Sequence, residues 1–556
     1  MSLTNLPPLL SLKDAFLAVG ASALTTHYIF KRWEPHAIPV VVTLLIVLPL
    51  ALSFLLHGHY SWFIAIPFSF LTYYATLASS ISLYRLSPFH PLAKYPGPFK
   101  HRLSQFFILK ATRTGKRHLY IQQLHEKYGD IVRIGPNEVS IRDVSAIGPL
   151  MGTNGWPKGP FYLGHTMGPQ PIPAMITIRD PALHAKRRRP WNRAFSTAAL
   201  KEYEPLIAHR VSQLVEKLVS DKGPVDLARY ISYFTYDFMG DMVFGGWYEM
   251  LRDGDKDKKW ELMEASLKTT STLENIPWIT YFIRHVPSVA STVKKHRASA
   301  LAKGAERRAQ GSKTKDLFYY LNNDDGAEPE QSPEGVVVAD AVLAVIAGSD
   351  TTASVLSNIF YSLLRYPDTY KRLQAEIDHY YPVGEDPTNP KHYPKMTFLD
   401  AVLNETLRLY PAVPSGSQRA AQPGVASGGK VVGPYYLPEG TQARIHFYSV
   451  HRDARNFYPH PDSFWPNRWL VAEGEEPAPK DFRHNPSAFI PFSFGPYNCV
   501  GKNLALQEMR VVVCAILQNL ELRFAEGWDI NRWNQELEDR FVTKKGSLPV
   551  VVTRRH

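Results

Sequence analysis

Two long stretches without a charged residue lie near the N-terminus, and they constrain the fold more than any other feature of the chain. They are residues 38–56, IPVVVTLLIVLPLALSFLL, and residues 60–84, YSWFIAIPFSFLTYYATLASSISLY. A helix of about 20 apolar residues crosses the hydrocarbon core of a bilayer, and both stretches are close to that length. Pro49 and Pro67 would kink helices in water, but membrane helices tolerate proline. We therefore predict membrane-spanning helices here.

A weaker third candidate, residues 15–30, precedes these two stretches. Basic side chains follow the first and the last candidate, at Lys31, Arg32, Arg85, Lys94, Lys100 and Arg102. Whether the chain crosses two or three times, both basic clusters fall on one side, which the positive-inside rule identifies as the cytosol. A cleaved signal peptide has one apolar region of only about 7–15 residues. Burial of these stretches inside a soluble core is the other alternative.

The composition changes after residue 94, at the proline-rich segment Tyr95-Pro96-Gly97-Pro98. A stiff break of this kind is typical of a domain boundary. We therefore predict two parts. Residues 1–94 are expected to form a membrane anchor with two or three transmembrane helices. Residues 95–556 are expected to form a globular catalytic domain without a further apolar run of spanning length.

The chain has two cysteines, Cys499 and Cys514, so disulfides do not hold this fold together, and free thiols suit a reducing compartment. The net charge is +12. Such a charge fits an anionic membrane surface, an acidic partner protein or simply a solvated basic surface. Nucleic acid is not an expected partner, because no finger, basic zipper or aromatic RNA-binding motif accompanies the charge.

One cysteine lies in an unusual setting, the segment Phe492-Ser493-Phe494-Gly495-Pro496-Tyr497-Asn498-Cys499-Val500-Gly501. Turn-forming residues surround the cysteine, and residues 502–520 read as a helix from their apolar spacing. The thiol is thus expected at a helix N-terminus, where N–H groups and the helix dipole favour an anionic sulfur on a metal. The alternative is a buried free thiol, which is what we expect of Cys514 inside the apolar helix.

This segment resembles the haem-binding loop of the cytochrome P450 family, whose pattern is FxxGxxxCxG. Phe492, Gly495, Cys499 and Gly501 occupy its four fixed positions. The resemblance implies that Cys499 is the axial ligand to the iron of haem b, and that Phe492 packs near the sulfur. Many members have arginine or histidine two residues before the cysteine, donating to a haem propionate. Here that residue is Tyr497, whose phenol can form hydrogen bonds but carries no charge.

A second motif, Glu405-Thr406-Leu407-Arg408, is expected in a helix from about Phe398 to Leu409. Glutamate and arginine three residues apart share a helix face, and isolated pairs of this kind are common on surfaces. The resemblance identifies Glu405 and Arg408 as the ExxR pair of the family, part of a buried structural network. Its third member is Arg468, in the aromatic and proline-containing segment 464–469.

A third motif contains Asp350 and Thr351, inside an apolar helix expected to begin near Gly335. An acid and a hydroxyl there go against local helix preference, as is common at functional sites. The alternatives are a helix N-cap or a surface patch. By resemblance, Thr351 is the alcohol on the oxygen side of the haem, able to open the helical hydrogen bond and seat a water. Asp350 is then the acid that relays protons to bound dioxygen.

A fourth motif places His184 and Arg188 four residues apart on one face of a helix. The resemblance assigns both to a haem propionate, and it assigns Arg419 to propionate binding as well. The neighbouring basic residues are expected to face outward and to form part of a docking surface for an acidic flavoprotein reductase. These are Lys186, Arg187 and Arg189.

The fold implied by the resemblance is mainly α, the cytochrome P450 fold: a helical haem domain with a small β subdomain, after the transmembrane anchor. The implied activity is a haem-thiolate monooxygenase that inserts one atom of O2 into a small lipophilic substrate. Electrons would come from NADPH through a separate NADPH-cytochrome P450 reductase. Two rival functions stay open: a haem-thiolate isomerase or dehydratase without external electrons, and a non-enzymatic membrane haem sensor.

The expected substrate pocket uses the loop from Trp156 to Met175, the helix near Val345 and Ile346, and the turn 412–417, which are largely apolar. The anchor and the cysteine loop resemble those of fungal microsomal members. That resemblance implies the endoplasmic reticulum membrane, a cytosolic catalytic domain and a role in terpenoid-like secondary metabolism, with broad xenobiotic oxidation as the alternative.

Overall fold

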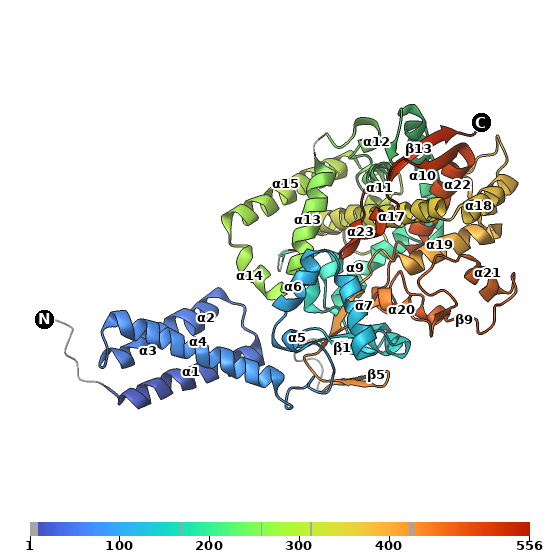
Figure 1. Cartoon of the computed structure of the whole chain (residues 1–556). Coiled ribbons are helices and arrows are strands. Elements are labelled where there is room, and N and C mark those ends of the chain that lie inside the picture. The colour runs from blue at the N-terminus through green and yellow to red at the C-terminus, as the bar shows by residue number, and fades with distance from the viewer. Residues whose placement is uncertain (1–8, 167–169, 257, 312–313, 422–427) are drawn as a thin grey trace.

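The chain folds into a helical arm at the N-terminus and a much larger, mainly helical body, as Figure 1 shows. The computed structural model describes residues 9–166, 170–256, 258–311, 314–421 and 428–556. Among the described residues, strands are short and form several small sheets. The prediction of a mainly helical protein with a small β part is confirmed.

The arm consists of α1 (Leu12–Trp33), α2 (Ile38–Val42), a π-helical turn η1 (Thr43–Val47), α3 (Leu48–His57) and α4 (Trp62–Leu86). The π turn precedes Pro49, which has no N–H to offer to the carbonyl of Leu45. The hydroxyl of Tyr74 on α4 donates to that carbonyl instead, and Tyr73 donates to the carbonyl of Leu44 at 2.7 Å. The proline is therefore tolerated because a neighbouring helix supplies the missing donor.

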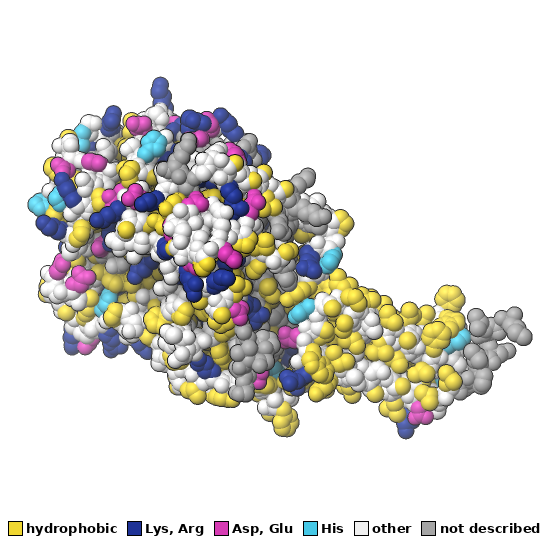
Figure 2. Space-filling model, turned by 180° about the vertical axis from the view of Figure 1, so that it is seen from behind, with side chains coloured by type: hydrophobic (Ala, Val, Ile, Leu, Met, Phe, Trp, Pro, Cys, Tyr) yellow, Lys and Arg dark blue, Asp and Glu magenta, His cyan; other side chains and the backbone are white. Residues whose placement is uncertain are grey.

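Helix α1 packs along α4 and completes the arm. Thr26 of α1 and Tyr73 of α4 are fully buried, and their hydroxyls lie 2.5 Å apart. His27 Nδ1 and Ser80 Oγ make a second polar contact at 2.7 Å. The outer surface of the arm is apolar: Figure 2 shows hydrophobic side chains covering it, whereas charged side chains are spread over the body. Phe63 is 93% exposed, which is unfavourable in water.

By length and composition, three helical segments among the described residues could cross a membrane. Two are in the arm, Ile38–His57 and Trp62–Leu86, with 11% and 22% of their apolar windows buried inside the protein. The third, Glu334–Arg365, has 56% of its window buried and runs through the body. The prediction that the body has no apolar run of spanning length was therefore wrong, because the central helix of a large core has a similar composition.

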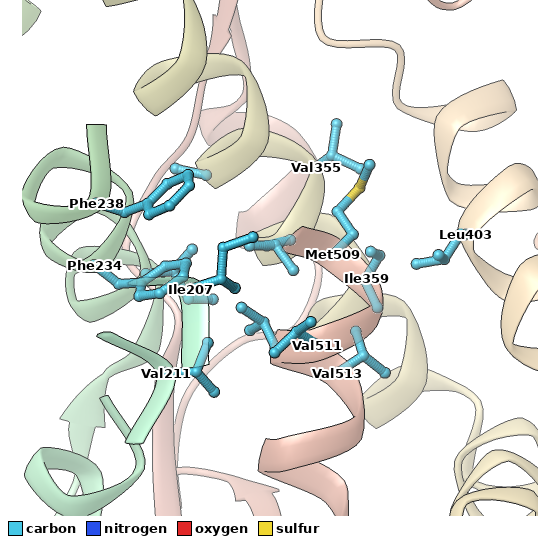
Figure 3. Close-up of a cluster of buried hydrophobic side chains, with 14 of the residues drawn as sticks. Ile207, Val211, Phe234, Phe238, Val355, Ile359, Leu403, Met509, Val511 and Val513 are labelled. Carbon is cyan, nitrogen blue, oxygen red and sulfur yellow. The ribbon is translucent and has the colours of Figure 1, made fainter. Parts of the chain in front are cut away.

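The body is built around that central helix, α17. Apolar side chains of α10, α11, α19 and α22 pack against it, and Figure 3 shows the contact region with Ile207, Phe234, Ile359, Leu403 and Val511. The helices of the body are α5 (Phe99–Leu103), α6 (Phe106–Arg113), α7 (Arg117–Tyr128), α8 (Ile147–Met151), α9 (Pro181–Ala194), α10 (Thr197–Ser220), α11 (Leu227–Phe244), α12 (Met250–Asp253), α13 (Lys259–Leu273), α14 (Thr280–Ile283), α15 (Pro287–Gln310), α16 (Leu317–Leu321), α17 (Glu334–Arg365), α18 (Pro367–Tyr380), α19 (Thr397–Leu409), α20 (Phe447–Val450), α21 (Asn467–Glu473), α22 (Lys502–Asn519) and α23 (Arg532–Glu536).

The largest sheet has the order β1-β2-β7-β4, with β2 and β7 parallel and the other pairs antiparallel. Arg419 lies in the middle of β4, paired with Ala443 of β7. The strands are β1 (Ile131–Arg133), β2 (Glu138–Ile141), β3 (Val225–Asp226), β4 (Gln418–Ala420), β5 (Lys430–Val432), β6 (Tyr435–Leu437), β7 (Gln442–Ile445), β8 (Phe457–Tyr458), β9 (Arg483–His484), β10 (Leu520–Phe524), β11 (Glu538–Arg540), β12 (Val542–Lys544) and β13 (Pro549–Arg554).

Candidate functional site

The loop that carries Cys499 is a tight turn pressed against α8. The amide of Cys499 donates to the carbonyl of Phe492 at 2.9 Å. Gly495 has φ +72°, and a Cβ on it would lie 2.1 Å from the carbonyl oxygen of Met151. Only glycine fits there, since any side chain would collide with backbone. The turn leaves Cys499 two residues before Gly501, the cap of α22, as the turn formers predict.

The sulfur of Cys499 faces an internal space. The side chain is accessible, yet burial raises the pKa of its thiol, while the N–H of Gly501 and the cations Arg188 and Lys502 act to lower it. A side chain that is both accessible and desolvated lines a cavity rather than the outer surface. Hydrogen-bond donors and positive charge at such a place suit a thiolate bound to a metal.

The middle of α17 also has an accessible residue in a segment that is otherwise buried. Ala347 is exposed, although it lies in a helix of the core between the buried residues Val345 and Ser349. The hydroxyl of Thr351, one turn along, donates to the carbonyl of Ala347 at 2.6 Å. Helix α17 packs against α22, which Cys499 precedes. The structure thus places the predicted alcohol and the predicted cysteine on two neighbouring elements, each with an accessible side chain close to them.

Asp350 lies next to Thr351 but is buried, and its Oδ2 has no hydrogen-bond partner. Desolvation raises the pKa of Asp350 to about 7; Lys545 partly offsets this effect and Glu264 adds to it. A carboxyl group with such a pKa can both take up and release a proton near neutral pH. An N-cap and a surface patch, the alternatives at this motif, are both wrong, because α17 already begins at Glu334 and Asp350 is buried.

Basic side chains gather around the ring of Tyr497. The guanidinium carbon of Arg419 lies 4.9 Å from the ring centroid, and Nζ of Lys158 lies 5.4 Å from it. The ring of His184 is 4.5 Å away between centroids. Arg419 is fully buried, and none of its three side-chain nitrogens has a hydrogen-bond partner. Leaving a buried guanidinium unsatisfied is costly, so the Arg419 nitrogens are suited to donate to an anionic group.

The pKa values reflect this excess of positive charge. Burial, together with the positive charges of Lys158, Arg188 and Arg419, lowers the pKa of His184 to about 3. Burial also lowers the pKa of Lys158 well below its usual value, with Arg419 and Arg188 acting in the same direction. A dianion such as the two propionates of a haem would offset these charges and accept from the free nitrogens of Arg419. The residues present therefore fit that cofactor.

Two basic residues of α9 have other partners in the structure. Arg188 donates to the backbone carbonyl and the side-chain oxygen of Asn498, at 2.7 and 2.8 Å, and so fixes the residue before Cys499. Arg187 forms an ion pair of 2.7 Å with Asp340 on α17 and is mostly buried. The expectation that Arg187 faces outward was wrong, because a buried carboxylate on the neighbouring helix draws it inward. Lys186 and Arg189 are exposed, as expected.

The predicted network of Glu405, Arg408 and Arg468 is completely buried. The Glu405 carboxylate accepts two bonds of 2.8 Å from Arg408 and bonds of 3.1 and 3.2 Å from Nε of Arg468. Burial acts to raise the pKa of Glu405, but the two arginines outweigh it, so the pKa lies below its ordinary value. Arg408 also donates to the carbonyl of His451, which ties α19 to the segment after α20.

Lys158 and Asp340 were not singled out from the sequence. Lys158 falls in the loop 156–175 that was expected to line the pocket, of which residues 167–169 lie outside the described residues. Asp340 accepts from the amide of Met175 at 2.8 Å and so ties the end of that loop to α17. A charged residue in an otherwise apolar helix was the available signal for Asp340. No signal marked Lys158, because its contacts come from distant segments.

The arrangement is that of a mainly helical protein whose cysteine loop and unpaired buried cations would fit an anionic metal cofactor beside a long central helix. The sequence matches the Cytochrome P450 family over residues 96–549. The chain therefore belongs to the cytochrome P450 family and is a monooxygenase of the oxidoreductase class, for which the family implies haem with a cysteine thiolate.

Similar proteins come from fungi. Cytochrome P450 monooxygenase FCK2 of Fusarium pseudograminearum is 36% identical over 86% of this chain and 85% of its own length. Cytochrome P450 67 of Uromyces fabae is 35% identical over 91% of this chain and 93% of its own length. Tryprostatin B 6-hydroxylase of Aspergillus fumigatus is 32% identical over 87% of this chain and 84% of its own length.

Proposed function

We propose that this protein is a haem-thiolate monooxygenase with Cys499 as the axial ligand and Asp350 and Thr351 on the oxygen side. The observation that carries the proposal is the pairing of an accessible, desolvated Cys499 with a buried Arg419 whose nitrogens lack partners. Arg419, His184 and Lys158 would hold the propionates of haem b, and Tyr497 would lie beside them. When bound, the haem supplies the reductive activation of dioxygen.

The residues of this chain then have distinct tasks. The turn held by Gly495 and by the Cys499 amide fixes the position of the sulfur. Phe492 accepts from the Cys499 amide, and the N–H of Gly501 points toward the sulfur. Asp350, with a pKa of about 7, holds a proton next to the Thr351 hydroxyl and releases it toward the pocket. Glu405, Arg408 and Arg468 fix the surrounding backbone without touching the substrate.

We further propose that electrons arrive from NADPH through a separate reductase, since flavoprotein reductases are acidic and this chain carries a net charge of +12. The apolar arm would span the endoplasmic reticulum membrane, with residues 95–556 as the catalytic domain in the cytosol. The last turns of α1 and α4 contain the basic residues Lys31, Arg32 and Arg85. Both helices end at the side of the arm nearest the body (Figure 1).

The proposed substrate is a small lipophilic molecule of fungal secondary metabolism. Support comes from the apolar residues of the expected pocket and from relatives such as Tryprostatin B 6-hydroxylase. A terpenoid-like skeleton and the broad oxidation of xenobiotics remain the two substrate proposals. A non-redox isomerase, a dehydratase or a haem sensor does not need protons delivered to dioxygen, which is the role proposed for Asp350 and Thr351.

The test is the difference spectrum of the reduced, carbon-monoxide-bound protein in microsomes. The wild type should give the band of a thiolate-ligated haem, and Cys499→Ser should lose it because a serine oxygen is a poor substitute for the thiolate. Cys514→Ala, at the other cysteine of the chain, is the matched control and should keep the band, since Cys514 is buried in α22. Folded wild-type protein without the band would overturn the proposal.

Activity requires a second measurement. The same microsomes, supplied with NADPH and a reductase, are incubated with lipophilic extracts under labelled dioxygen. Incorporation of one labelled oxygen atom into a product supports the monooxygenase. Product formed without NADPH, or haem binding without any product, would favour the isomerase or the sensor respectively.

A further inference from the structure

The junction between the arm and the body carries positive charge that is not matched by negative charge. Residues 35–125, which run from the turn after α1 into α7, contain no aspartate or glutamate. Three arginines meet at this junction: Arg85 in the last turn of α4, Arg102 in α5 and Arg133 in β1. Helices α4 and α5 pack together, and α5 and β1 lie on the side of the body nearest the arm (Figure 1). None of the roles proposed above uses this cluster.

Direct contacts between the arm and the body hold the three arginines together. Nη1 of Arg85 donates to the carbonyl of Leu103, the residue after Arg102, at 2.6 Å. Nη2 of Arg133 donates to the carbonyl of Arg85 at 3.3 Å. A Cβ on Gly97 would lie 2.2 Å from the carbonyl oxygen of Arg133, so glycine is required where the boundary segment crosses β1. The junction is therefore held in one arrangement.

Arg102 differs from the other two arginines in its lack of partners. No described residue forms a hydrogen bond or an ion pair with its side chain. Its Nε is buried, whereas the residue is partly exposed and its two terminal nitrogens are accessible. A guanidinium presents its N–H donors in a fixed fork that matches the oxygens of a phosphate. Arg102 is thus available to bind an anion from outside the protein.

The groups that face these arginines are cationic or neutral. Burial lowers the pKa of Arg133 to about 10, the charges of Arg102 and Arg85 act in the same direction, and Tyr84 opposes them. His90 Nε2 lies 3.3 Å from Nη2 of Arg133. Burial and the charges of Arg133 and Arg85 lower the pKa of His90 to about 4, so this ring is neutral near pH 7. The cluster therefore keeps a net positive charge.

The acidic residues that flank these elements in the chain have other partners. Asp130 and Glu138, on either side of β1, pair with Arg142 and Arg444 at 2.8 and 2.9 Å. Glu34, at the end of α1, acts on an arginine of the body outside the cluster. None of the described acidic side chains forms an ion pair with the three arginines. An anion from outside the protein is therefore needed to balance their charge.

The proposed anchor puts this cluster at the cytosolic surface of the membrane. Arg85 is in the last turn of α4, and Nζ of Lys31, in the last turn of α1, lies 3.8 Å from the centroid of the Tyr84 ring. Phe89 follows α4 and Phe99 begins α5, and they are 88% and 65% exposed. Aromatic rings and long cationic side chains are typical of the layer in which lipid headgroups lie.

We infer that Arg85 and Arg102 bind the phosphate of an anionic phospholipid in the cytosolic leaflet, with Arg133 and Lys31 adding positive charge. Basic clusters beside membrane-spanning helices on the cytosolic side bind such headgroups. Phosphatidylcholine suits the site less, because its choline brings a cation toward the arginines. Phosphatidic acid suits it best, because a phosphomonoester carries more than one negative charge near pH 7 and offers three oxygens. The inference rests on the proposed membrane anchor, whose lipid contact it specifies.

The test counts the lipids that stay on the full-length, haem-loaded protein. Native mass spectrometry is performed after release from nanodiscs of equal parts phosphatidylcholine and phosphatidic acid. The wild type should retain phosphatidic acid in preference by about tenfold or more, because several cations favour the anionic headgroup. Equal retention of the two lipids would overturn the inference. Displacement of the lipid by inorganic phosphate would identify a soluble anion as the occupant and would overturn it as well.

A neutral substitution locates the preference. Arg102→Gln should abolish it, and the protein should still fold because the Arg102 side chain makes no hydrogen bond that could be lost. The matched control is Arg113→Gln, at an exposed arginine in the last turn of α6. It removes the same charge from the same acid-free stretch and should keep the full preference. Loss of the preference in both variants would mean that only overall charge matters.

A charge reversal gives a second readout, thermal unfolding. The wild type should unfold at a higher temperature in nanodiscs with phosphatidic acid than in phosphatidylcholine alone, because the lipid binds the folded state. Arg102→Glu brings its own negative charge to Arg85 and Arg133. It should therefore be more stable than the wild type in phosphatidylcholine and gain nothing from phosphatidic acid. An equal gain in both proteins would contradict the site.

Two measurements keep the lipid site separate from the proposed function. Alkaline carbonate treatment of the microsomes tests the anchor, and release of the protein would overturn the anchor and the lipid site together. Protein that stays in the membrane without a headgroup preference would overturn the lipid site alone. The carbon-monoxide band of the same sample reports the haem site, which this cluster does not touch.

Discussion

At the scale of single residues, Arg419 is a buried charge that the fold alone does not explain. Its three nitrogens lack partners, in contrast to Arg540, which is equally enclosed but donates to Glu538 and to the carbonyls of Thr112 and Arg113. A buried arginine whose nitrogens all have partners, like Arg540, supports the fold. A buried arginine without partners, like Arg419, is available to bind an anion. This distinction follows from hydrogen-bond satisfaction and not from burial.

Arg419→Met should therefore weaken haem retention without weakening the apoprotein. We expect the haem dissociation constant to rise about tenfold or more, because a charge-assisted hydrogen bond contributes about 1.5–3 kcal/mol. The apoprotein should be as stable as the wild type or more stable, since a buried unpaired cation is removed. Haem transfer to an acceptor protein and urea unfolding of the apoprotein measure the two effects. Arg540→Met, as control, should destabilise both forms, and a loss of apoprotein stability in Arg419→Met would contradict the assignment.

Asp350→Asn should change the pH dependence of stability. The pKa of Asp350 is raised to about 7 in the folded protein, so the folded state binds its proton more tightly than the unfolded state. The stabilisation from this group is present below the unfolded pKa and is lost as the pH rises toward 7. Asparagine does not titrate, so the variant should gain stability relative to the wild type at pH 8.5 and lose that gain at pH 4. Thermal unfolding followed at the haem absorption band measures this, and a pH-independent difference would refute the shifted pKa.

Thr351→Ala should keep the haem spectrum but uncouple NADPH use from product formation. The hydroxyl that now bonds to Ala347 is lost, and protons then reach the oxygen side without its guidance. The ratio of product to NADPH consumed is the measurement, with a fall of about tenfold or more expected. Thr352→Ala, at a buried neighbour on the same helix, is the control and should stay coupled. Full coupling in Thr351→Ala would show that this hydroxyl has no part in proton delivery.

At the scale of elements, one carboxylate joins α19, α21 and the strand-rich segment between them. Glu405 accepts from Arg408 and Arg468 and also from the amide of Trp465 at 2.9 Å. The Arg468 guanidinium in turn donates to the carbonyls of Pro459 and His460. A buried network of this kind fixes the relative positions of elements, and removal of one member leaves the others charged and unpaired.

Arg468→Met should accordingly destabilise the protein by about 3–5 kcal/mol, because the buried Glu405 carboxylate loses one of its two cationic partners. Guanidinium unfolding measured by far-ultraviolet circular dichroism provides the free energy. The control is Arg532→Met, which breaks an i,i+4 pair with Glu536 at a side chain that is 64% exposed. That pair is worth only about 0.3–0.5 kcal/mol. Equal effects of the two substitutions would show that the network is not a structural support.

At the scale of the whole molecule, the proposed membrane anchor allows two topologies, in which the arm crosses the bilayer two or three times. Residues 38–57 and 62–86 are long and apolar enough to span it, and α1 falls outside that set. Yet α1 packs along α4 through buried Thr26 and Tyr73, and its last turn carries Lys31 and Arg32. These contacts favour α1 as a third span, with its basic end beside the body.

Glycosylation mapping tests the number of spans. An acceptor sequence inserted at Gly58, between α3 and α4, should be modified, because the proposed orientation puts that turn on the lumenal side with two spans or with three. An acceptor in a flexible extension before residue 1 should also be modified if α1 spans the membrane, and should stay unmodified if it does not. An acceptor after His556 is the control for the cytosolic side. Modification of that C-terminal site would invert the predicted orientation.

The sequence alone determined a good part of this protein. Charge-free runs and helical spacing predicted the arm and the helices around residues 335–365, 397–409 and 502–519, because these patterns are local in the chain. Turn formers around Cys499 likewise predicted a thiol at the start of a helix. The motifs of the cysteine loop and of Glu405 and Arg408 carried the resemblance to the family.

Tertiary structure decided what depends on segments far apart in the chain. Arg187 was expected in solvent but pairs with Asp340, and Lys158 joins Arg419 and His184 around Tyr497 although nothing in its own segment marks it. Periodicity fixes which face of an element is buried, but the partner that a buried charge meets is set by the packing of distant elements.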